Sequence, residues 1–164
     1  MPKMSTQRQL IGLAGWLVVS FSAAFIGAVA SLNAASFYGQ LARPRWAPPS
    51  WLFAPVWTLL YVLMAVAAWL VWRSHGFKAS RKGLVLFLVQ LAANALWTWL
   101  FFAWHQGAGA FSEVLILWVL IVATIASFRS VSNLAATLLV PYLAWVTFAA
   151  ALTLSVWQLN PGLL

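Results

Sequence analysis

Residues 51–72 read WLFAPVWTLLYVLMAVAAWLVW, a run without a single charged side chain. As a helix this run is long enough to cross the roughly 30 Å of hydrocarbon in a bilayer. Four further runs have the same apolar character, at 10–32, 83–103, 110–128 and 134–157. None of them shows the strict alternation of a barrel strand. The sequence therefore predicts an all-α, polytopic membrane protein: a bundle of five transmembrane helices that forms a single domain over residues 1–164.

The composition excludes a water-soluble fold. Apolar residues make up 65% of the chain and charged residues only 6%, whereas a typical soluble domain has roughly 25% charged residues. We expect the lipid bilayer as a partner and no nucleic acid, because the cations behind the net charge of +8 lie between apolar runs and form no basic stripe. The first run exceeds the roughly 7–15 residues of a signal-peptide core, so we expect it to be retained.

The connection between the first two runs, residues 33–50, is too rich in proline and aromatic residues for a solvated linker. Asn33 is placed to cap a short helix that continues to about Leu41, and Pro44 would end that helix. We expect the segment to form a lid over the mouth of the bundle. The alternative is an aromatic belt at the membrane interface, which Trp and Tyr also favour.

Positive charges are unevenly divided between the two ends of the predicted helices. One end carries Lys3, Arg8, Arg73, Lys78, Arg81, Lys82 and Arg129. The other end carries only Arg43 and Arg45. By the positive-inside rule we expect a plasma or inner membrane protein with its N-terminus in the cytoplasm, and with the lid and C-terminus outside.

The predicted spans offer little acid-base chemistry. Glu113 is their only acidic or basic side chain, and His105 lies in the preceding loop. Ion pumps and hydrolases place several such groups within reach of one another. We therefore expect no proton pump, no catalytic residue, no metal site and no cofactor, and we interpret His75 and His105 as loop residues. The chain has no cysteine, which excludes disulfides and thiolate chemistry.

Aromatic side chains are instead abundant: 12 Trp, 11 Phe and 3 Tyr. Three predicted helices place aromatic or amide residues on one face at helical spacing. These stripes are Trp57 and Tyr61; Gln90, Asn94, Trp97 and Phe101; and Tyr142, Trp145, Ala149 and Leu152. They would either pack helix against helix, with amides bonded across the interface, or line a cavity for a large, flat, apolar ligand. Periodicity does not separate these two interpretations.

Three segments resemble the TspO/MBR family, the tryptophan-rich sensory and translocator proteins. Residues 46–61, WAPPSWLFAPVWTLLY, resemble its W-x-P-P-x-W stretch. QLAAN at 90–94, with Trp97 and Phe101-Phe102, resembles its third-helix motif, and PYLAW at 141–145 resembles its fifth. The family pattern has Pro and Gly where this chain has Trp99 and Ala103. Without that proline we expect a locally straighter third helix.

The resemblance implies a five-helix bundle, often dimeric, that binds porphyrins such as protoporphyrin IX and, in some members, haem, sterols or drug-like aromatic molecules. The positions that match the family's pocket are Trp46, Trp51, Phe53, Trp57, Tyr61, Asn94, Trp97, Tyr142, Trp145, Ala149 and Leu152. Arg43 and Arg45 are candidates for holding ligand carboxylates. Sterol binding is doubtful, because Leu154 and Gln158 stand where the sterol pattern needs an aromatic and a basic residue.

We therefore predict an integral membrane binding protein, a sensor or carrier of tetrapyrroles. A light-dependent porphyrin-degrading enzyme is the alternative, and a structural or assembly protein without a ligand is the second alternative. Small residues would serve a homodimer, because they let helices approach closely. The candidates are Gly12 and Gly15 on the first helix, or Ala92 and Ala95 on the third.

Overall fold

The computed structural model describes residues 4–164, so Lys3 lies outside the described part of the chain. The long helices are α1 (Thr6–Ala30), α3 (Phe53–Ala79), α4 (Arg81–Thr98), α5 (Gly107–Arg129) and α7 (Val140–Leu159). The short helical segments are α2 (Ala34–Gln40), the 3₁₀ turn η1 (Ser50–Leu52), the π-helical turn η2 (Trp99–Ala103) and α6 (Asn133–Leu138). No strand occurs between residues 4 and 164.

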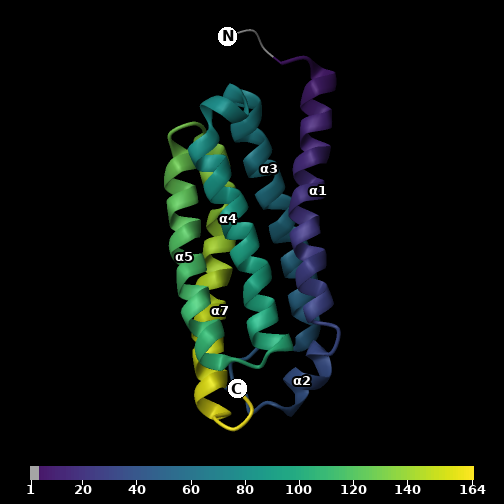
Figure 1. Ribbon diagram of the computed structural model, residues 1–164, viewed down its shortest axis with the longest axis vertical. Helices are drawn as coiled ribbons and strands as arrows, with labels where there is room; N and C mark the ends of the chain where they lie inside the picture. Colours follow the sequence, from purple (N-terminus) through teal and green to yellow (C-terminus); the bar gives the residue numbers. More distant parts are fainter. Residues whose placement is uncertain (1–3) are drawn as a thin grey trace.

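Five helical segments are long and apolar enough to cross a membrane, which confirms the predicted all-α, five-span bundle. They are Thr6–Ala30, Ser50–Ala79, Arg81–Ala103, Gly107–Arg129 and Asn133–Leu159. The long helices run side by side along one axis (Figure 1). The protein is therefore a multi-pass membrane protein, as the apolar composition requires.

The core lies where the long helices meet. α5 packs against α4 and α7, while α1 packs against α3 and α4 at the edge of the bundle. Met64, Phe87, Ile121 and Phe128 are fully buried in this core. In contrast, Val18 of α1 is 66% exposed, as expected for a side chain that faces lipid.

The charged ends of the bundle match the predicted division. The start of α1 and the α3–α4 and α5–α6 connections lie at one end, and α2 and the C-terminus lie at the other (Figure 1). The six described cations of the larger set thus share one end, and Arg43 and Arg45 follow α2 at the other. Which end faces the cytoplasm stays a prediction.

Two irregularities change the helix boundaries that the sequence suggested. α3 continues past the predicted end to Ala79 and is interrupted at Gly76, whose φ of 74° glycine adopts at low cost. The third span is not regular α-helix to its end, and whether it is straighter than in relatives that have the proline stays a prediction. A π-helical turn occupies Trp99–Ala103, so this helix is irregular without the family's proline.

The small residues proposed for self-association do not share one outer surface. A Cβ added at Gly12 would collide with Trp72, so the α1 backbone needs glycine there to pack within the chain. Ala95 is also buried inside the bundle, whereas Ala92 is exposed. Only Gly15 has open space beside it on α1. The homodimer itself stays a prediction.

Candidate functional site

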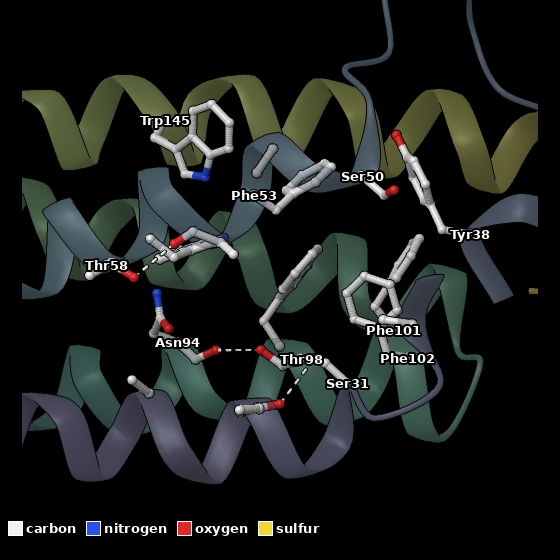
Figure 2. Close-up of a pocket in the computed structure, with 18 of the residues that line it drawn as sticks. Ser31, Tyr38, Ser50, Phe53, Thr58, Asn94, Thr98, Phe101, Phe102 and Trp145 are labelled. Carbon is white, nitrogen blue, oxygen red and sulfur yellow. Dashed lines mark hydrogen bonds between the residues drawn. The ribbon is translucent and has the colours of Figure 1, made fainter. Parts of the chain in front are cut away.

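A cavity of about 670 Å³ lies between α1, α3, α4 and α7, and α2 covers one end of it (Figure 2). Its volume falls within the roughly 300–1,000 Å³ of small-molecule sites. Its lining is largely apolar and aromatic. The wall residues that the argument below uses are Phe21, Phe25, Tyr38, Phe53, Trp57, Tyr61, Asn94, Trp97, Phe101, Trp145, Ala149 and Leu152.

Aromatic rings from three helices form much of the wall. The Trp97 ring stacks on Phe101, with centroids 5.4 Å apart and planes 12° from parallel. Trp145 of α7 meets Phe53 of α3 edge to face at 5.9 Å. Ala149, one turn after Trp145, leaves space beside the indole. Such ring faces and edges suit a flat, apolar ligand.

A chain of buried hydrogen bonds forms the polar part of the wall. The Tyr61 hydroxyl donates to Asn94 Oδ1 at 2.7 Å, and Asn94 Nδ2 donates to the Tyr142 hydroxyl at 2.9 Å. Tyr142 in turn donates to Gln90 Oε1 at 2.8 Å. These bonds fix the amide orientation of Asn94. Asn94 Nδ2 uses one of its two hydrogens in this chain.

Two hydroxyl groups of the wall donate to backbone carbonyl groups four residues earlier in the chain. Thr58 Oγ1 donates to Ala54 O at 2.8 Å, and Ser31 Oγ donates to Gly27 O at 3.0 Å. These hydroxyls therefore add little polarity to the cavity. Tyr61 and Asn94 are hydrogen-bonded to each other in the wall and form a fixed polar pair that can orient a ligand.

The structure brings eight of the eleven predicted pocket residues into the cavity wall. These are Phe53, Trp57, Tyr61, Asn94, Trp97, Trp145, Ala149 and Leu152. Tyr142 lies behind the wall, fully buried, and acts on the cavity by holding Asn94. The residue spacing on α7 predicted the inward face on which Tyr142 lies. Its hydroxyl group, however, is hydrogen-bonded to Asn94 and Gln90 and does not face the cavity.

Trp46 and Trp51 lie outside the cavity, contrary to their placement by family resemblance. Trp51 is 70% exposed, and Trp46 is 50% exposed with its ring edge against Phe148 at 5.7 Å. The reason lies in the backbone between them. Pro49 is extended and is followed by the 3₁₀ turn η1, which leaves the Trp51 side chain on the outside.

Arg43 and Arg45 also lie outside the wall. The Arg43 guanidinium sits over the Tyr38 ring, 4.8 Å from its centroid, and Tyr38 itself lines the cavity. Burial raises the pKa of the Tyr38 hydroxyl above its usual value, and the nearby Arg43 partly offsets this, so the hydroxyl remains a donor at neutral pH. Arg45 is exposed.

The lid is folded onto the bundle rather than spread as a belt. The Phe37 ring of α2 stacks on His105 with centroids 4.0 Å apart. Asn33 precedes α2 as predicted, but its side chain makes no capping hydrogen bond. The lid is instead fixed by Asn160, whose Oδ1 accepts from Ala42 N and whose Nδ2 donates to Ala42 O, both at 2.8 Å.

Sequence reasoning predicted the lid but missed the contribution of Tyr38, on the lid, and of α1 to the wall. Phe21 and Phe25 are four residues apart and both line the cavity, and that spacing was an available signal. Gly27 lies so close to α4 that an added Cβ would be 3.3 Å from Thr98 Oγ1. The role of Asn160 carried no local signal, because its partner is 118 residues away in sequence.

Acid, histidine and cysteine side chains do not gather at the cavity. Within residues 4–164, no group of three or more His, Cys, Asp or Glu could hold a metal ion. Glu113 is buried in α5 but does not line the cavity. The site as described is suited to noncovalent binding of an apolar molecule.

Comparison with known proteins agrees with the motifs and the five-span fold. A sequence model of the TspO/MBR family matches residues 10–158. The chain is 40% identical over 151 residues to Protein CrtK of Rhodobacter capsulatus, covering 90% of this chain and 91% of that protein. It is 38% identical to the tryptophan-rich protein TspO of Chlorobaculum tepidum, covering 94% and 99% respectively. The translocator protein of Ovis aries is 41% identical over 128 residues, covering 77% of this chain and 76% of its own length.

Proposed function

The chain belongs to the TspO/MBR family, and we propose that it binds a large, flat, apolar ligand of the tetrapyrrole class in the cavity between α1, α3, α4 and α7. Protoporphyrin IX and haem-type molecules are the ligands that we propose. Binding would serve a sensor or carrier in the membrane.

The observation that carries this proposal is the composition of the cavity wall. Aromatic rings surround a space of about 670 Å³, and a fixed amide and phenol, Asn94 and Tyr61, stand among them. Ring contacts supply affinity through buried apolar area, and two fixed polar groups supply orientation. Helix packing alone does not require an open space of this size, because protein interiors are normally filled.

A titration of the purified protein with protoporphyrin IX, in the dark and under illumination, tests the proposal. Trp57, Trp97 and Trp145 line the cavity, so bound porphyrin should quench tryptophan fluorescence with a saturable, one-site curve. A structural protein without a ligand would give only a linear, nonspecific decrease. That result would refute the proposal.

The same titration separates a binding protein from the alternative, a light-dependent porphyrin-degrading enzyme. Degradation in which tryptophan side chains take part requires tryptophans next to the ligand. The tryptophans of the wall meet that requirement, so we retain this alternative. A binding protein leaves the absorption spectrum of bound porphyrin stable in light. An enzyme produces a new absorbing species in light, with multiple turnovers, and none in the dark.

A further inference from the structure

Four buried side chains have no hydrogen-bond partner among the described residues: the hydroxyl groups of Ser20 and Ser80, and two larger groups on α4 and α5. One is the indole nitrogen of Trp97, Nε1, on α4. The other is the carboxyl group of Glu113 on α5, of which both oxygens are unpartnered although the residue is only 7% exposed. Trp97 Nε1 can only donate, and the carboxyl group can accept. These two larger groups are thus complementary.

The packing of α4 against α5 brings these two groups to the same level of the bundle. The helices are antiparallel and in close contact. Towards one end Gly83 lies against Phe128, and towards the other Leu100 lies against Gly109. Interpolation between these two contacts places Trp97 and Glu113 at the same level of the two helices.

We propose that Glu113 is the hydrogen-bond acceptor for the Trp97 indole N–H, and that the bond forms when a flat ligand fills the cavity and turns the Trp97 ring. Glu113 is then a positioning residue: it does not touch the ligand but fixes the indole that does. This inference rests on the proposed function, because the ligand supplies the displacement.

The surroundings of the two groups support this pairing. Trp97 is in the cavity wall and stacks on Phe101, so a ligand that enters between the rings displaces the indole. Glu113 has no ion pair among residues 4–164, and it is the only acidic side chain of the whole sequence. An intramembrane acid that is left without a partner is costly, and such residues normally mark functional positions.

Infrared difference spectroscopy with octaethylporphyrin, a tetrapyrrole without carboxyl groups, tests the pairing. Because the chain has one acidic side chain, the carboxyl bands that disappear in Glu113→Gln belong to Glu113. Saturating porphyrin should shift these bands in the wild-type protein. Trp97→Phe keeps an aromatic ring but has no N–H, so it should bind the porphyrin without the shift. Glu113→Leu should weaken binding by about two- to tenfold, the effect of one hydrogen bond.

Each outcome has one meaning. If the wild-type protein binds the porphyrin without a shift of the Glu113 bands, the pairing is wrong while the proposed function stands. If the shift persists in Trp97→Phe, another group or a water molecule is the partner, and the pairing is again wrong. If tryptophan quenching shows no saturable binding at all, the proposed function fails, and this inference fails with it.

Discussion

The Asn160 side chain holds the lid against the end of α7, so replacing it with alanine should accelerate ligand release. Asn160 is buried at the end of α7 and makes two hydrogen bonds to the backbone of Ala42, each 2.8 Å long. Asn160→Ala removes both bonds and leaves the Ala42 amide and carbonyl groups to find other partners. The substitution also removes the bond from Asn160 Nδ2 to Val156 O, 2.7 Å long, at the end of α7. The backbone hydrogen bonds of α7 are kept, so the main effect should be on the lid.

The magnitude follows from the number of bonds lost. A hydrogen bond contributes a net of about 0.5–1.5 kcal/mol, so the two lid bonds contribute about 1–3 kcal/mol. Since 1.4 kcal/mol is a tenfold change, the equilibrium between open and closed lid should shift by about 5- to 150-fold. If the lid must open before the ligand leaves, the dissociation rate rises by the same factor.

The assay is the dissociation of protoporphyrin IX from protein in lipid nanodiscs, followed by recovery of tryptophan fluorescence after dilution. Asn33→Ala is the matched control, because it makes the same change in the lid at a side chain without a capping hydrogen bond. A dissociation rate for Asn160→Ala within twofold of wild type would refute the reasoning. An equal acceleration in Asn33→Ala would also refute it, because the effect would then not depend on the lost bonds.

Three further predictions concern the wall, the ligand's acidic groups and the orientation. Trp145→Phe should weaken porphyrin binding by about 1–2 kcal/mol, because buried area and a ring contact are lost. Trp51→Phe, which lies outside the cavity, should leave the titration unchanged. Equal effects of the two substitutions would mean that the aromatic stripe of α7 only packs against other helices. Arg43→Gln should weaken binding of protoporphyrin but not of its dimethyl ester, with Arg45→Gln as the milder variant, since only Arg43 adjoins a wall residue; equal losses for acid and ester would exclude a role in holding carboxylates. A reporter fused to the C-terminus should be active only outside the cytoplasm, and cytoplasmic activity would reverse the predicted orientation.

The five spans could be predicted from sequence because their signal is local and strong. Each helix satisfies its own backbone hydrogen bonds, so length and apolarity alone identify it. The inward faces were also predictable where aromatic and amide residues recur every three or four positions, as at Asn94 and Trp97. The partners of these residues were not predictable, because the stripe does not reveal that Tyr61 and Tyr142 bond to the same amide from opposite sides.

The differences between predicted and observed side-chain positions share a physical cause, which is that side-chain direction in irregular segments depends on the backbone rather than on periodicity. Trp46 and Trp51 flank two prolines, and Trp51 lies in the 3₁₀ turn that follows them, where its side chain is exposed. Likewise, the π-helical turn at Trp99–Ala103 adds a residue to one turn of the third span. A motif therefore identified the correct segment in both places but not the direction of its side chains.

The proposed binding site must both select its ligand from the bilayer and exchange it, and we assign the first task to the wall and the second to the lid. Lipid tails are as apolar as the ligand, so apolar area alone gives a ligand little reason to leave the bilayer for the cavity. Close ring contacts and a fixed polar pair must supply the difference, and the rigid network from Tyr61 to Gln90 holds that pair in place without ligand. The lid is joined to the end of α7 by the Asn160 side chain and to the connection before α5 by the stacking of Phe37 on His105. These few contacts are separate from the Tyr61–Asn94–Tyr142 network of the wall. If the proposed function holds, we therefore expect substitutions in the bundle to change ligand selectivity and substitutions in the lid to change the rate of exchange.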